Sequence, residues 1–131
     1  MNPATPAVAL PASVAVNPRL GDWLRVLRSG VVEVRPGKVE LGQGVLTALS
    51  QVAAEELDIG VARVRMIPAA TGASPDEGYT AGSLSIQHSG SAIRLVCAEA
   101  RVLYLGVAAA RLGVPESKLT VADGQILAPD G

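Results

Sequence analysis

A long apolar periodicity over residues 83–112 constrains the fold of this chain more than any other feature of its sequence. Apolar residues recur there every three and four positions, which is the spacing of a helix. A helix with apolar residues on two sides is expected to be buried on two sides. The sequence therefore predicts one long helix between other elements. Its first apolar row is Ile86, Ile93, Cys97, Ala100, Tyr104 and Val107, and its second row is Leu95, Ala98, Val102, Leu105 and Leu112.

The side chains available to surround this helix are small. The 131 residues are 49% hydrophobic and 18% charged, a balance that excludes an intrinsically disordered chain. There is no Phe, and the aromatic residues are Trp23, Tyr79 and Tyr104, whereas Ala and Val are abundant. Because small aliphatic side chains each bury little area, a core made of them is thin. We therefore expect the chain to depend on contacts with other protein.

Charge, cysteine and histidine content exclude several classes of function. Eleven Lys and Arg residues oppose 12 Asp and Glu residues, so the net charge is −1 and no basic surface for nucleic acid is expected. The single cysteine, Cys97, excludes an internal disulfide and a cysteine-rich metal site. The single histidine, His88, excludes a zinc motif with two histidines.

Membrane and export signals are also not expected. No apolar run reaches the roughly 20 residues of a transmembrane helix. Pro3, Pro6 and Pro11 interrupt the apolar N-terminus, which has no positively charged region before it. The expected location is the cytoplasm, or the periplasm if a signal segment is missing.

Local patterns divide the chain into an arm and a domain. Residues 1–18 are rich in Pro and Ala and are expected to form an extended arm, either a disordered tail or a segment laid across a partner. Residues 19–131 form the domain. The predicted elements before and after the long helix are a hairpin over 23–35, an extended piece over 38–41, a helix over 45–58, a strand over 62–67, a loop over 68–82 and a hairpin over 118–127. This order predicts an α+β fold with two helices, one of them long, packed on a small β-sheet with hairpins.

Two glycine-containing junctions could bind a ligand. Gly42, Gln43 and Gly44 lie where an extended piece meets a helix, so the backbone can approach a ligand and the first helical amides can face an anion. The spacing does not match a dinucleotide-binding fingerprint, because Thr47 stands where that motif has glycine. A plain tight turn is the alternative.

The second junction opens the long helix. Thr80, Ser83 and Ser85 place hydroxyl groups at a helix start, where backbone amides have no partner within the helix. These hydroxyls could contact a phosphate, or one of them could simply cap the helix. No nucleophile with a matching base is found, so the residues indicate binding without a catalytic group.

Both junctions belong to longer segments that resemble one enzyme family. Residues 37–49, GKVELGQGVLTAL, and residues 75–90, PDEGYTAGSLSIQHSG, are similar to segments of the molybdopterin-binding large subunits of the xanthine dehydrogenase and aldehyde oxidase family. The similarity is greatest to the branch that contains isoquinoline 1-oxidoreductase beta subunits and nicotinate dehydrogenase-like enzymes. The resemblance implies that this chain is part of a larger molybdopterin-binding domain.

The resemblance also implies roles for the two junctions. Gln43, between Gly42 and Gly44, would lie against the pterin and donate a hydrogen bond near the oxygen ligand of the molybdenum. The second segment would bind the dinucleotide part of molybdopterin cytosine dinucleotide. Position 84 departs from the Gln of that branch, which leaves a backbone contact possible there but removes a side-chain contact. The second segment consists of Thr80, Ala81, Gly82, Ser83, Leu84 and Ser85. Both segments are expected to meet at one shared pocket.

The implied whole enzyme would oxidise an aldehyde or an N-heteroaromatic carbon, with water as the oxygen source. Its catalytic glutamate has no match in this chain, which would therefore be a fragment, a truncated product or one piece of a split subunit. The implied partners are the remainder of the molybdenum subunit, an iron–sulfur subunit, and a small aromatic or aldehyde substrate. The alternative function is a non-enzymatic interaction module that keeps the fold without binding the cofactor.

Overall fold

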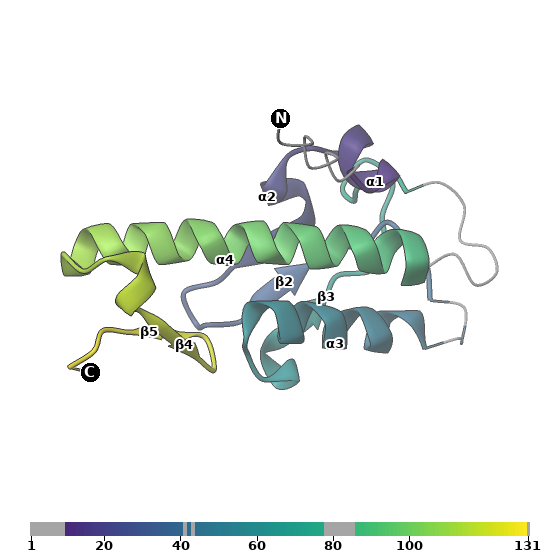
Figure 1. Cartoon of the computed structure of the whole chain (residues 1–131). Coiled ribbons are helices and arrows are strands. Elements are labelled where there is room, and N and C mark those ends of the chain that lie inside the picture. The colour runs from purple at the N-terminus through teal and green to yellow at the C-terminus, as the bar shows by residue number, and fades with distance from the viewer. Residues whose placement is uncertain (1–9, 41, 43, 78–85, 131) are drawn as a thin grey trace, which may run out of the picture.

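Two long helices lie side by side against a small β-sheet in the computed structural model (Figure 1). The structure describes residues 10–40, 42, 44–77 and 86–130. The helices are α3, Val45–Leu57, and α4, Ser91–Leu112, which continues from a π-helical turn, η2, at Ile86–Gly90. This arrangement confirms the predicted α+β fold.

The sheet has three strands in the order β1-β2-β3. β1, Leu24–Val26, pairs antiparallel with β2, Val32–Val34, as predicted for the first hairpin. β2 pairs parallel with β3, Val64–Met66. Because parallel strands need a crossover connection, α3 is the helix that carries the chain from β2 to β3.

The N-terminal region differs from the expected extended arm. Ala12–Val16 forms a short helix, α1, and the extended conformation is wrong there. Pro11 precedes the first turn, where its missing N–H group is not needed, and Val14 is buried in the core. A second short helix, α2, follows at Leu20–Trp23. Burial of Val14 and Trp23 stabilises a conformation that the proline content alone does not favour.

The second hairpin is confirmed. β4, Thr120–Ala122, pairs with β5, Gln125–Leu127. Its turn residues Asp123 and Gly124 have φ of 48° and 74°, as a tight hairpin turn requires. The Asp123 side chain accepts a hydrogen bond from the Gly60 amide at 2.9 Å, so the turn rests on the corner after α3. The remaining short elements are the 3-10 turns η1, Val61–Arg63, and η3, Glu116–Lys118.

The predicted extended piece over 38–41 is not a strand in its described part, residues 38–40. The segment leaves the sheet after β2, and the polar groups of Lys38 and Glu40 bind other loops and the start of α3 instead. Residue 41 lies outside the described residues.

The core lies between the sheet, α3 and the first half of α4. Its apolar members are Val14, Trp23, Leu24, Val32, Val34, Val45, Leu49, Ala53, Leu57, Ala92, Ile93, Val96, Cys97 and Ala100. Most of these are small side chains, as the composition indicates. Trp23 is the largest, and its indole N–H donates to the Asn17 carbonyl oxygen at 2.8 Å.

Only part of α4 is buried, which contradicts the expectation of burial on two sides. The last described core residue on this helix is Ala100. Beyond it, Val102, Leu103, Tyr104 and Val107 are exposed. The strands are only three residues long, and Figure 1 shows that α4 extends well past the sheet. The helix is therefore longer than the layer that covers it.

This difference between the two halves of the fold can be measured with one matched pair of substitutions. Leu49→Ala removes a fully buried side chain from α3 and is expected to lower the free energy of unfolding by about 2–5 kcal/mol. Leu103→Ala removes the same atoms from an exposed position on α4 and is expected to change it by less than about 0.5 kcal/mol. Urea denaturation of both variants provides the test. Equal losses would contradict this description of the core.

Candidate functional site

The two junctions predicted to bind a ligand start at the same end of the molecule. α3 begins at Val45, directly after the first junction, and η2 begins at Ile86, directly after the second. Figure 1 shows both helices starting at this end. A Cβ atom added to Gly90, in η2, would lie 3.9 Å from Cδ2 of Leu49 in α3. Gln43 and all six residues of the second predicted segment, Thr80 to Ser85, lie outside the described residues.

Gly42 and Gly44 have backbone conformations that favour glycine. Their φ angles are 92° and 75°, a region that other residues rarely adopt. A Cβ atom added at either position would meet no described atom within 4 Å. Open space therefore borders both glycines, and a ligand can approach the backbone there.

The amides at the start of α3 are less available than the sequence predicts. The Glu40 carboxylate accepts a hydrogen bond from the Gly44 amide at 2.7 Å and another from the Leu46 amide at 3.0 Å. A carboxylate is a favourable partner for the positive end of a helix. The chain thus supplies its own anion to two amides that we expected to face a ligand. An anionic ligand at this helix would have to bind beside Glu40.

The loop before the second junction is fixed to the loop before the first. Oε2 of Glu77 accepts a hydrogen bond from the Gly37 amide at 2.6 Å and another from the Ser89 hydroxyl at 2.8 Å. Nζ of Lys38 donates to the Glu77 carbonyl oxygen at 2.9 Å. We call Gly37, Lys38, Glu77 and Ser89 the Glu77 junction. It joins three segments that are far apart in the sequence.

This set of contacts is well protected from solvent. Lys38 is 2% exposed and Ser89 is fully buried. The backbone at Gly37 is so close to the opposite loop that an added Cβ atom would overlap the Pro75 carbonyl oxygen and lie 2.8 Å from Cγ of Glu77. Glycine is required at position 37 by lack of space.

Asn17 holds the same loop from the other side. Its side-chain amide donates to the Asp76 carbonyl oxygen at 2.9 Å and accepts from the Asp76 amide at 3.2 Å. It also donates to the carbonyl oxygen of Ser13, in α1. Residues 76 and 77 are therefore positioned by contacts with the N-terminal region, the segment after β2, and η2.

Sequence reasoning missed the roles of Lys38 and Glu77. Charged residues in polar loops usually face water, and Glu77 stands beside Asp76 as an apparent pair of exposed acids. The only signal was their place in the two segments that resemble the enzyme family. Within the described residues, no group of three or more His, Cys, Asp or Glu side chains could hold a metal ion.

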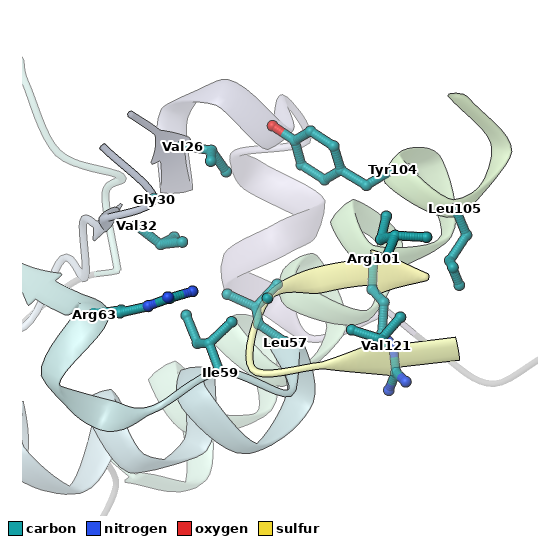
Figure 2. A pocket seen from close by; sticks show the side chains of 12 residues that line it. Val26, Gly30, Val32, Leu57, Ile59, Arg63, Arg101, Tyr104, Leu105 and Val121 are labelled. Carbon is teal, nitrogen blue, oxygen red and sulfur yellow. The ribbon is translucent and has the colours of Figure 1, made fainter. Parts of the chain in front are cut away.

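A separate apolar pocket lies at the opposite end of α3, away from both junctions (Figure 2). Its volume is about 160 Å³. Figure 2 shows Val32, Leu57 and Ile59 around the hollow, with the Arg63 guanidinium extending toward it. Arg63 also donates to the Asp123 carbonyl oxygen at 2.6 Å. This pocket cannot be part of a site built from residues 42–44, because α3 separates the two.

Cys97 is a core residue and not a reactive thiol. Burial raises the pKa of its thiol from 9.0 to about 12, and the nearby Glu56 carboxylate contributes to this rise. A thiol in this environment stays protonated and is a poor nucleophile. In the described part of the chain, no helix is long and apolar enough to cross a membrane.

Comparison with known proteins identifies relatives of this chain. A family model described as "Molybdopterin cofactor-binding domain" matches residues 4–131. One subunit of the nicotinate dehydrogenase from Pseudomonas putida is 38% identical over 109 residues, covering 83% of this chain and 9% of that protein. The beta subunit of isoquinoline 1-oxidoreductase from Brevundimonas diminuta is 37% identical, covering 92% of this chain and 16% of that protein. The chain thus spans only a small part of the length of these curated relatives.

A solved structure has the same fold. The reconstituted CO dehydrogenase from Oligotropha carboxidovorans matches with a TM-score of 0.72 and 26% identity, covering 81% of this chain and 13% of that chain.

The close approach at Gly37 predicts a position-specific effect of one methyl group. Gly37→Ala is expected to lower the free energy of unfolding by about 1–3 kcal/mol, because the added Cβ atom must displace the Pro75 backbone. The matched control is Gly21→Ala in α2, where the new Cβ atom meets no described atom. That control is expected to be neutral or slightly stabilising. Urea denaturation midpoints compare the two, and a neutral Gly37→Ala would contradict the close packing of this loop.

The raised pKa of Cys97 predicts a loss of stability at high pH. The folded thiol has the higher pKa, so the folded state holds its proton where the unfolded thiol has lost it. The free energy of unfolding is therefore expected to fall by about 1.4 kcal/mol per pH unit as pH rises from 9.0 toward 12. Cys97→Ala lacks this contribution and is expected to show a shallower decline over the same pH range. Parallel declines would show that the thiol is not shielded as described.

Proposed function

Because the chain belongs to the molybdopterin cofactor-binding domain family of molybdenum hydroxylases, we propose that its two glycine-containing junctions bind opposite parts of one molybdenum cofactor. The main support is the Glu77 junction. It hydrogen-bonds the segment that leads to Gly42 to the segment that leads to Thr80. Two segments held together at their bases can reach the same ligand.

The first junction would contact the pterin and the molybdenum centre. Gly42 and Gly44 border open space and lack side chains, so the described residues fit a bulky group that approaches the backbone. Gln43, between them, would donate a hydrogen bond from its side-chain amide near the oxygen ligand of the metal. The Glu40 carboxylate holds the start of α3 and keeps the turn in place. Once bound, the cofactor would supply the redox chemistry, and this chain would supply position and hydrogen bonds.

The second junction would contact the dinucleotide part of the cofactor, which we propose to be molybdopterin cytosine dinucleotide. Backbone amides and hydroxyl groups suit phosphate oxygens. The residues proposed to do this are Thr80, Ala81, Gly82, Ser83, Leu84 and Ser85. Leu84 would contribute only its backbone.

The whole protein, in this proposal, oxidises an aldehyde or an N-heteroaromatic carbon with water as the oxygen source. The relatives' names identify nicotinate and isoquinoline oxidation in those proteins. The remainder of the molybdenum subunit would supply the catalytic glutamate, and an iron–sulfur subunit would accept electrons. Residues 19–131 would be the cofactor-binding part, with 1–18 as an arm that contains α1, and the assembled enzyme would be cytoplasmic.

A non-enzymatic interaction module is the second candidate. The observation in its favour is the exposed apolar row on the second half of α4, formed by Val102, Leu103, Tyr104 and Val107. Exposed apolar patches of this kind are typical of protein contacts. Purification with the other subunits distinguishes the two candidates, since only the first requires molybdenum and pterin in the complex.

Two substitutions separate cofactor binding from catalysis in the assembled enzyme. Gly82→Val is expected to reduce molybdenum and pterin content roughly tenfold, by removing close backbone contacts worth one charged hydrogen bond. Gln43→Ala is expected to reduce turnover by about a hundredfold while the cofactor content changes little, because it removes one hydrogen-bond donor beside the reacting centre.

Exposed positions provide the controls for this experiment. Gly21→Val in α2 matches the first change, and Gln51→Ala on the outer side of α3 matches the second. Metal analysis, pterin fluorescence and turnover are measured for each variant. Full molybdenum content in Gly82→Val, or full turnover in Gln43→Ala, would refute the corresponding role.

A further inference from the structure

We propose that Glu77 is a positioning residue whose carboxylate sets the distance between the two cofactor-binding segments. The proposed function gives this distance its purpose, so the inference rests on it in that respect. The geometric part concerns described residues only and can be tested without any cofactor.

One oxygen atom of Glu77 connects three segments. Oε2 accepts the Gly37 amide at 2.6 Å and the Ser89 hydroxyl at 2.8 Å. Hydrogen bonds to a carboxylate are shorter and about twice as strong as those between neutral groups. Both donors are shielded from water by close packing, since Ser89 is fully buried and Gly37 has no room for a Cβ atom. This oxygen is therefore a fixed point between the segment after β2 and η2.

The connectivity makes this fixed point decisive for the second segment. Glu77 and Ser89 are 12 residues apart in the sequence, and residues 80–85 lie between them. The hydrogen bond between their side chains therefore closes a loop that contains the whole proposed dinucleotide-binding segment. The hydrogen bond to Gly37 ties the base of that loop to the chain five residues before Gly42. One carboxylate thus links the bases of both segments.

The backbone of Glu77 adds a second connection to the same place. Nζ of Lys38 donates to the Glu77 carbonyl oxygen at 2.9 Å, and Lys38 is 2% exposed. The side chain and the main chain of Glu77 both bind the segment of residues 37–38. A rotation of the loop about a single contact is prevented.

The choice of a carboxylate here is unfavourable on stability grounds alone. Oε1 of Glu77 is buried, and it has no hydrogen-bond partner among the described residues. An unsatisfied buried acceptor destabilises a protein, whereas an apolar side chain of similar size avoids that penalty. An apolar side chain could not accept from Gly37 and Ser89, however. The presence of Glu is explained when the spacing between the segments matters more than the stability of the loop.

The test measures the spacing directly in the purified full chain without cofactor. Spin labels are attached to cysteines introduced at Val39, after Gly37, and at Gln87, in η2. Both side chains are exposed, whereas the native Cys97 is fully buried and stays unlabelled. The distance distribution between the labels is expected to be narrow in the parent protein. In Glu77→Ala it is expected to broaden and shift to longer distances.

Three further variants complete the set. Glu77→Gln keeps an amide oxygen that can accept both hydrogen bonds, so it is expected to restore the narrow distribution. Ser89→Ala is expected to broaden it, and it replaces Glu77→Ala if that variant does not fold. Ser91→Ala is the matched control, because its hydroxyl donates to the Gln87 carbonyl oxygen on the exposed side of the same helix start. It is expected to change nothing.

Cofactor content is then measured in the assembled enzyme for the same variants. Molybdenum and pterin content are expected to fall in Glu77→Ala and Ser89→Ala, and to remain near the parent level in Glu77→Gln and Ser91→Ala. An unchanged distance distribution in Glu77→Ala overturns the inference. An altered distribution with full cofactor content overturns its consequence for binding. A parent enzyme without molybdenum overturns the proposed function instead, and the distance measurement still decides the role of Glu77.

Discussion

The packing of α3 against the first half of α4 is the contact on which the rest of the structure depends. Small side chains line it, including Ala53, Ala92 and Ala100, so the two helices can approach closely. Leu49 and Ile93 fill the space between them and the sheet. Because both helices begin at the same end (Figure 1), this contact brings the two glycine-containing junctions to one side of the molecule. A binding site made of two distant segments follows from one apolar contact.

A second, polar layer refines what the apolar core places only coarsely. The core determines that α3 and η2 are neighbours, but helices with small side chains can slide against each other. The Glu77 junction adds directional contacts, and directional contacts of a charged group have strict distance requirements. The Glu40 carboxylate does the same for the turn at Gly44. The chain thus uses its own carboxylates to hold the backbone segments that we propose bind a charged cofactor.

The exposed second half of α4 has a different meaning. A core that ends at Ala100 leaves an apolar helix surface without cover from the described residues. The chain spans at most 16% of the length of its nicotinate dehydrogenase and isoquinoline 1-oxidoreductase relatives. A helix built to be buried on two sides is consistent with a domain whose further contacts come from other protein. The apolar pocket between Leu57, Ile59 and Val32 lies in this same half and has no connection with the proposed cofactor site.

Sequence by itself determined the elements whose signal is local. The apolar period fixed α3 and α4, alternation and turn residues fixed both hairpins, and the Asp123–Gly124 turn followed from the left-handed conformation that this pair adopts readily. The two candidate junctions were also found from local glycine and hydroxyl patterns. Burial of Lys38, the hydrogen bonds of Glu77, the helix at Ala12–Val16 and the exposure of α4 beyond Ala100 were decided only by the tertiary structure. Each depends on which distant segment covers a residue, and a charged or proline-rich loop carries no periodic signal of its neighbours.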